Sequence, residues 1–316
     1  MRILVTGASG FVGSALCANL VGQGFMVLGA VRCLPDREIA GVDYRLVADL
    51  SGDTNWSEAL SGVDVVVHCS ARVHVMQDME KDPLMVFREV NVKGTIRLAK
   101  QAVDKGLKRF IYISSLKVNG ECTDGDPFNA DDIPKPTDPY SISKWEAEQE
   151  LKNIARETDL EIVIIRPPLV YGVGVQANFF RLMQAVKLGL PLPLGAITNR
   201  RSLVALDNLV ALIVTCLDNK AAANQIFLVS DGEDLSTPEL LRRTAGAMGR
   251  TARLFPISVP LLLKVASLLG KAAFAHRLCD SLQADINKTR DLLGWSPPFS
   301  VDESLQKTTQ QFLSQN

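Results

Sequence analysis

The residues best placed to do chemistry are Tyr140 and Lys144, spaced four apart in Tyr-Ser-Ile-Ser-Lys. On a helix this spacing places both side chains on one face, about a turn apart. A phenol ordinarily titrates at about pH 10, and a neighbouring ammonium favours the phenolate and brings it closer to neutral pH. With Ser115 hydrogen-bonded to the same oxygen, the pair can move a proton on and off an alcohol or carbonyl. Taken alone the pair is weak evidence, since many helices carry one by chance.

A glycine-rich turn at the N-terminus gives this pair its setting. Residues 2–6 are apolar and predict a strand, and Gly7-Ala-Ser-Gly10-Phe-Val-Gly13 leads from it into a helical pattern. A strand, a glycine turn and a helix start form the pyrophosphate site of a dinucleotide fold. Gly7 permits a tight turn, Gly10 lets the backbone approach phosphate, and Gly13 lets helix and strand pack closely. A nicotinamide bound there would exchange a hydride while Tyr140 exchanges the proton.

In the first half of the chain, apolar segments with a strand pattern alternate with segments that have a helical pattern. They predict strands over residues 3–6, 26–31, 44–47, 63–68, 110–114 and 162–165, and helices that begin near Val12, Trp56, Val86 and Tyr140. This alternation is typical of an α/β fold, a Rossmann-type doubly wound parallel sheet with helices on both faces.

The pattern becomes irregular from about Pro167, which predicts a smaller C-terminal substrate lobe. Such a lobe would cover the carboxyl ends of the strands, where open sheets bind ligands. We expect a dinucleotide-binding domain over residues 1–166, partly re-entered around 203–230, and a mainly substrate-binding lobe over 167–316.

Composition narrows the classes of partner. The 316 residues carry 34 Lys and Arg against 35 Asp and Glu, so no basic field draws the chain to nucleic acid. Six scattered cysteines without a Cys-x-x-Cys pair indicate reduced thiols and no metal site. The first strand begins at once, so we expect no signal peptide and a cytoplasmic protein. His68 is interpreted as a core residue, and His74 and His276 lack carboxylate or cysteine neighbours at useful spacing.

One strongly apolar stretch, residues 259–275, calls for a membrane test. It is interrupted by Lys264, Gly270 and Lys271 and falls short of the ~20 apolar residues that a membrane span needs. A buried or lid-forming helix is the favoured interpretation, and weak peripheral membrane association is the alternative.

The chain resembles the extended short-chain dehydrogenase/reductase family, in the nucleotide-sugar epimerase and reductase branch to which UDP-glucose 4-epimerases belong. Seven segments along nearly the whole chain carry the resemblance: Thr6 to Gly13, Asp49-Leu50, Asn91 to Gly94, Ile113-Ser114-Ser115, Arg166 to Gly172, Arg201 to Asp207, and Leu293 to Pro297. Together they are highly specific. The resemblance also implies a homodimer, through two helices per subunit.

The resemblance implies a catalytic triad of Ser115, Tyr140 and Lys144. It implies cofactor contacts at a larger set: Gly7, Ser9, Gly10, Phe11, Val12, Gly13, Arg32, Asp49, Leu50, Ser70, Ala71, Asn91, Tyr140, Lys144 and Pro167. For Asn91 two roles stay open, support of the helix that bears the pair and proton relay.

The choice of cofactor depends on the end of the second predicted strand. A carboxylate there would hydrogen-bond the adenosine ribose and favour NAD, but the sequence has Val31 followed by Arg32. A guanidinium can pair with a 2′-phosphate. We therefore expect NADP, with NAD as the alternative.

A net reductase draws on NADPH, whereas a 4-epimerase returns its hydride and needs only a retained NAD. The expected function is therefore NADPH-dependent reduction of a UDP-linked 4-keto sugar, a 6-deoxy N-acetylhexose as the guess. The first alternative is a UDP-hexose or UDP-N-acetylhexosamine 4-epimerase with bound NAD. The second is a non-catalytic dinucleotide sensor, against which the intact triad argues.

The substrate contacts are predicted from the same resemblance. Asn178 and Phe179, at a helix start, match the pyrophosphate and base contact, and Arg201 is the expected diphosphate ligand, with Arg200 as its rival. Arg277 is the candidate for a second arginine. Two departures from the family pattern, Lys117 as a substrate contact or an exposed residue and Asn119 in place of a tyrosine, indicate a reshaped sugar pocket.

Overall fold

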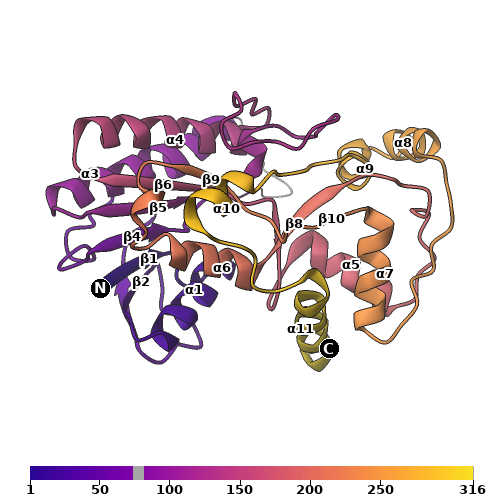
Figure 1. Ribbon diagram of the computed structural model, residues 1–316, viewed down its shortest axis with the longest axis horizontal. Coiled ribbons are helices and arrows are strands. Elements are labelled where there is room, and N and C mark those ends of the chain that lie inside the picture. Colours follow the sequence, from indigo (N-terminus) through magenta and orange to yellow (C-terminus); the bar gives the residue numbers. More distant parts are fainter. Residues whose placement is uncertain (74–81, 316) are drawn as a thin grey trace.

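A parallel sheet forms the centre of the computed structural model, which describes residues 1–73 and 82–315 (Figure 1). Its seven strands follow the order β3-β2-β1-β4-β5-β6-β9. They are β1 (Arg2–Thr6), β2 (Met26–Val31), β3 (Val42–Leu46), β4 (Val65–His68), β5 (Arg109–Ile113), β6 (Glu161–Arg166) and β9 (Ile226–Leu228). Every neighbouring pair is parallel. The strand order reverses between β1 and β4, and this is the switch point where such sheets bind ligands.

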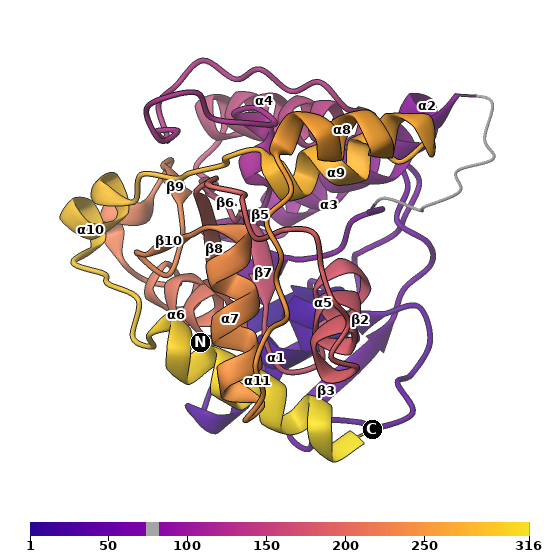
Figure 2. The same cartoon turned by 90° about the vertical axis from the view of Figure 1, so that its right-hand side faces the viewer.

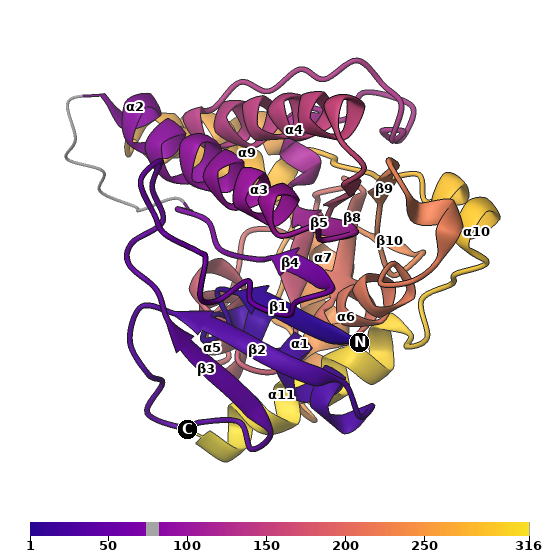
Figure 3. The ribbon, with the colours of Figure 1, turned by 90° about the vertical axis from the view of Figure 1, so that its left-hand side faces the viewer.

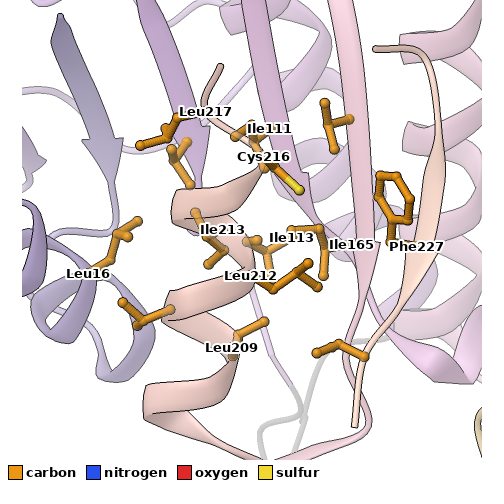
Figure 4. Packing of buried hydrophobic residues seen from close by; sticks show 14 of the residues in the cluster. Leu16, Ile111, Ile113, Ile165, Leu209, Leu212, Ile213, Cys216, Leu217 and Phe227 are labelled. Atoms are coloured by element: carbon orange, nitrogen blue, oxygen red, sulfur yellow. The ribbon is translucent and has the colours of Figure 1, made fainter. Parts of the chain in front are cut away.

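Helices cover both faces of this sheet, which confirms the predicted fold class (Figure 3). One face carries α1 (Phe11–Gly22) and α6 (Leu206–Thr215), and the other carries α3 (Thr95–Asp104) and α4 (Pro139–Glu157). Side chains alternate along each strand, so Ile111 and Ile113 of β5 pack toward α6, while Phe110 and Tyr112 pack toward α3 and α4. Figure 4 shows the α6 side of this core.

A second, smaller sheet of order β10-β8-β7 lies beside the first. Its strands are β7 (Leu169–Tyr171), β8 (Arg201–Ala205) and β10 (Asp234–Leu235). A separate hydrophobic cluster joins it to α5 (Ala177–Lys187), α7 (Thr237–Ala247) and α11 (Val301–Gln315). The chain passes from β8 to β9 of the large sheet and back to β10, so it crosses between the two sheets more than once. The exact domain boundaries stay a prediction.

The remaining elements are short. Before α3 lie α2 (Pro83–Phe87) and the π-helix η1 (Arg88–Gly94), and after β5 lies the 3-10 turn η2 (Leu116–Val118). Past α6 lie η3 (Lys220–Ala222), α8 (Val259–Leu268), α9 (Ala272–Cys279) and α10 (Asn287–Leu293).

All six predicted strands are present, within a few residues of their expected ends. The helix expected near Trp56 is wrong, because that segment forms turns. Trp56 is buried and its backbone N–H donates to the side chain of Gln101, so a contact with a distant residue holds this segment. The apolar stretch 259–275 is not one buried helix but the pair α8 and α9, and α8 has no buried residue. No helix in the described part of the chain has both the length and the apolar character to cross a bilayer.

Candidate active site

The glycine turn between β1 and α1 has the shape of a phosphate cradle. Gly7 adopts a φ of +65°, and a Cβ on Gly13 would lie 2.1 Å from the carbonyl oxygen of Gly7. No side chain larger than hydrogen fits at position 13, and no side chain caps the N-terminus of α1. The turn therefore leaves backbone N–H groups and the positive end of a 12-residue helix for an anion. This fits the pyrophosphate of a dinucleotide.

Arg32 and Asp49, both predicted as cofactor contacts, lie next to each other. An Nη1 atom of Arg32 donates to Oδ1 of Asp49 at 3.1 Å, and both side chains are largely exposed. Val31 is buried in β2 and faces the core. Asp49, from the connection after β3, thus places a carboxylate beside the guanidinium on which the NADP prediction rested.

Leu50 and Asn91 connect this region to the helices behind it. Leu50 packs so closely on η1 that a Cβ on Gly94 would lie 2.5 Å from its Cγ. The buried Asn91 side chain accepts from the Arg72 backbone at 2.8 Å and donates to its carbonyl and to Ser143 Oγ at 3.0 Å. Since Ser143 lies on α4, these contacts favour the supporting role of Asn91 over proton relay.

The segment after β4 is ordered by a neutral histidine. His68 lies between the hydroxyls of Thr6, 2.7 Å from Nδ1, and Thr95, 3.0 Å from Nε2. Burial, and to a lesser degree Lys144, lowers the pKa of His68 from 6.5 to about 3. Ser70, predicted to contact cofactor together with Ala71, donates its backbone N–H to Thr6 Oγ1 and lies against Gly7. His68 is therefore a core residue, as the sequence predicts.

Helix α4 carries Tyr140 and Lys144, and its first turn is fixed by a capping box between Asp138 and Ser141. Lys144 is buried, and its Nζ donates to the carbonyl of Ile113 at 2.8 Å. The same Nζ lies 5.9 Å from the centre of the Tyr140 ring. Because Ile113 ends β5 two residues before Ser115, this bond brings all three members of the predicted triad to one edge of the sheet.

The pKa values of Tyr140 and Lys144 only partly agree with the expectation from sequence. Burial lowers the pKa of Lys144 from 10.5 to about 8, with a partial opposing effect from Cys69 and Glu148. The pKa of Tyr140 is raised rather than lowered, first by burial and then by the carboxylate of Asp138. The protein alone thus keeps the phenol protonated, and a further positive charge near the ring is needed to favour the phenolate.

Lys117 and Asn119 both contact residues that support α4, and a role in the sugar pocket stays a prediction. Lys117 Nζ donates to Asp138 Oδ2 at 2.6 Å, so it binds the capping residue of α4, two positions before Tyr140. Asn119 is buried and accepts from Arg166 Nη1 at 2.9 Å. Both departures from the family pattern therefore act on the support of the catalytic helix.

On the substrate side, the two predicted arginines lie together. Arg201 Nη1 donates to the carbonyls of Arg277 at 2.9 Å and Asp280 at 3.0 Å. Burial, and the nearby charge of Arg277, lower the pKa of Arg201. Two neighbouring guanidinium groups suit a diphosphate. His276 was predicted to lack a carboxylate neighbour, but its Nδ1 lies 3.1 Å from Oδ2 of Asp280. His74 is outside the described residues.

The start of α5 holds Asn178 and Phe179, whose contact with the pyrophosphate and base stays a prediction. Asn178 is exposed, whereas Phe179 is buried, with its ring centre 5.3 Å from that of Tyr171. A cavity of about 390 Å³ lies between α5 and α11, and its lining residues include none of the triad. Pro167 is buried after β6, and its carbonyl accepts from Leu116 next to Ser115.

A buried ion pair behind the triad was not predicted. Glu148, one turn after Lys144 on α4, binds Arg166 of β6 and accepts from Ser114 Oγ at 2.5 Å. The spacing Tyr140, Lys144, Glu148 places all three on one helix face, and that spacing was visible in the sequence. The described residues contain no cluster able to hold a metal ion, and all six cysteines are free.

Comparison with known proteins matches this geometry to one family. The chain is 47% identical over 317 residues to UDP-glucose 4-epimerase of Vibrio cholerae, covering 99% of this chain and 96% of that protein. It is 27% identical to 2-alkyl-3-oxoalkanoate reductase of Stenotrophomonas maltophilia, covering 97% and 98%. The fold matches UDP-glucuronic acid 4-epimerase of Bacillus cereus in complex with UDP-glucuronic acid and NAD, with a TM-score of 0.81, 23% identity and complete coverage of both chains. Residues 3–230 match the model of the NAD dependent epimerase/dehydratase family, and the chain belongs to that family.

Proposed function

We propose that this protein is a UDP-sugar 4-epimerase that works with a retained NAD. The observation that carries the proposal is the 47% identity, over 99% of the chain, to the UDP-glucose 4-epimerase of Vibrio cholerae. The relative named as a reductase is more distant, at 27%. The first alternative from the sequence is thereby favoured over NADPH-dependent ketoreduction, for which the comparisons give no support.

The Arg32–Asp49 pair supports NAD over NADP. The expected phosphate ligand already pairs with a carboxylate at 3.1 Å, and that carboxylate opposes a second anion at the same place. Asp49 can also accept a hydrogen bond from the adenosine part of the cofactor. The glycine turn would hold the pyrophosphate, with Ser9, Phe11, Val12, Ser70 and Ala71 around it.

Bound NAD supplies a hydride acceptor and, once reduced, a donor. Tyr140 would take the proton from the C4 hydroxyl of the sugar. After the 4-keto sugar has rotated, Tyr140 would return the proton to the same oxygen as hydride adds to the other face of C4. Ser115 would hydrogen-bond the same oxygen. Lys144, its Nζ held by the Ile113 carbonyl, would hold the nicotinamide ribose, and its charge together with the positive charge of the oxidised nicotinamide would favour the phenolate. Arg201 and Arg277 would bind the diphosphate of the substrate.

Incubation of the purified protein with UDP-glucose and no added dinucleotide tests the proposal. We expect UDP-galactose to form, and NAD to be released when the protein is denatured. Strict dependence on added NADPH, with one cofactor consumed per product, would instead identify a ketoreductase. If Tyr140→Phe binds dinucleotide and no UDP-sugar is converted by the wild type, the protein is a sensor.

Three expectations from the sequence stay proposals: the division into a dinucleotide domain and a substrate lobe, the homodimer, and the cytoplasmic location. None of them is required by the chemistry above.

A further inference from the structure

Helices α8 and α9 form a surface that is apolar on its outer side. They lie together at one end of the molecule, in front of α3 and α4 in Figure 2. Leu261, Val265 and Leu268 recur at helical spacing along α8, and Leu268 is 81% exposed. Leu269 and Phe274 extend this outer side, and both are exposed. We call these five residues the α8–α9 surface.

The opposite side of α8 is already used. Val259, Leu262 and Leu263 are partly buried against the hydrophobic cluster of the substrate lobe. The outer leucines therefore do not belong to an intramolecular core. Because α8 is apolar on two sides and only one side packs on the protein, the other side is available to contact a membrane or a partner.

The charged side chains of the segment that forms this surface are cationic up to Asp280, which pairs with His276 at the end of α9. From residue 253 to residue 279 the chain carries four cationic side chains (Arg253, Lys264, Lys271 and Arg277) and no carboxylate, although the whole chain has a net charge of −1. All four are exposed. Lys264 and Lys271 flank the exposed leucines directly.

Exposed leucine and phenylalanine beside lysine and arginine is the composition of a helix that lies in a membrane interface. The apolar side chains enter the acyl boundary, while the lysine stems bring their ammonium groups to the level of the lipid phosphates. Neither helix is long enough to cross a bilayer. We propose that the α8–α9 surface docks the protein onto the surface of an anionic lipid bilayer.

The C-terminal end of α9 is hydrogen-bonded to the substrate lobe. The Asn199 side-chain amide donates to the carbonyls of Leu278 and Asp280 at 3.1 Å, and Arg201 donates to the carbonyl of Arg277. Both donors lie at the start of β8 or just before it. A membrane bound at α8 and α9 would thus lie beside the arginines to which the diphosphate is assigned. The inference itself does not depend on the proposed activity, since lipid binding requires no turnover.

Cosedimentation with vesicles of phosphatidylglycerol and phosphatidylcholine, compared with phosphatidylcholine alone, tests the proposal. We expect binding to the anionic vesicles that weakens as salt is added. Lys264→Gln together with Lys271→Gln should lower the partition coefficient about fivefold per charge removed. Leu268→Gln together with Leu269→Gln should lower it by about tenfold or more. The matched control is Lys105→Gln with Lys220→Gln, two exposed lysines elsewhere on the surface, which should leave binding within twofold.

A tryptophan introduced into the surface locates the contact. The chain has three tryptophans of its own, so the emission of Leu268→Trp is compared with that of wild type. With anionic vesicles the variant should show a blue shift that wild type lacks, and with phosphatidylcholine alone neither protein should show a shift. The proposal is overturned if wild type does not bind the anionic vesicles, or if the Lys105 and Lys220 control weakens binding as much as the Lys264 and Lys271 variant. It is also overturned if light scattering shows that the leucine variant converts a dimer to a monomer, because the surface is then covered by a second copy. Thermal unfolding and UDP-sugar turnover, measured on each variant, separate these outcomes from misfolding and from failure of the proposed function.

Discussion

Glu148 and Arg166 form a buried bidentate ion pair. Arg166 Nε donates to Glu148 Oε1 at 2.9 Å, and Arg166 Nη2 donates to Glu148 Oε2 at 2.5 Å. Their side chains are 0% and 1% exposed. Ser114 and Asn119 complete the network, which thereby links α4, β6 and the turn that carries Ser115. The pair fixes the catalytic helix against the sheet one turn after Lys144.

Removing one partner of this pair should be costly. Glu148→Gln leaves a buried guanidinium without its counter-charge, and we expect the free energy of unfolding to fall by about 3–5 kcal/mol. Urea denaturation at pH 7 measures this. The matched control is Glu146→Gln on the same helix, whose pair with Arg88 is partly exposed and should contribute less than about 1 kcal/mol. Equal losses in the two variants would show that the buried network does not anchor α4.

His68 should make the protein sensitive to acid. Its pKa is about 3 in the folded protein against 6.5 for an ordinary histidine, so unfolding takes up a proton between those values. The contribution of neutral His68 to the free energy of unfolding is fully present above pH 6.5. It is lost as the pH falls below that value, by about 1.4 kcal/mol per pH unit. His68→Asn removes this titration and should flatten the pH dependence of the free energy of unfolding between pH 6.5 and pH 4.5. Parallel pH profiles for the variant and wild type would contradict the assignment of a buried neutral imidazole.

Asp49 should decide between the two dinucleotides. Asp49→Asn releases Arg32 and removes the negative charge that opposes a 2′-phosphate, so the ratio of NADP affinity to NAD affinity should rise about tenfold. Titration calorimetry on cofactor-stripped protein measures both affinities. Asp53→Asn, an exposed carboxylate on the same connection, is the control and should leave the ratio unchanged. If Asp49→Asn behaves like that control, the pair with Arg32 plays no part in cofactor choice.

The sequence predicted what local pattern determines. The strands and the glycine turn are encoded in neighbouring residues, and Tyr140 and Lys144 are held on one helix face by their spacing alone. What it could not provide were contacts between distant segments. Trp56 begins no helix, and the segment around it is held by a hydrogen bond to Gln101, from another element. The hydrogen bonds of Lys117 to Asp138 and of Asn119 to Arg166 also join distant segments.

The basis of the NADP prediction was incomplete for the same reason, and the comparisons do not confirm NADP. Arg32 was read from the end of β2, where no carboxylate follows, but Asp49 approaches it after β3. Phe179 matched a motif position at a helix start, yet it is buried against Tyr171. The strands β7, β8 and β10 are short and pair with one another in the smaller sheet, although they are far apart in the sequence. No local periodicity reveals such pairing.

The central claim is that Tyr140 exchanges the proton at C4 while a hydride leaves the sugar and returns to it within one active site. UDP-glucose labelled with deuterium at C4, incubated without added dinucleotide, tests this directly. The account predicts UDP-galactose that keeps the deuterium at C4, with turnover lowered about a hundredfold or more in Tyr140→Phe. Product that has lost the deuterium from C4, or unchanged turnover in Tyr140→Phe, would contradict it.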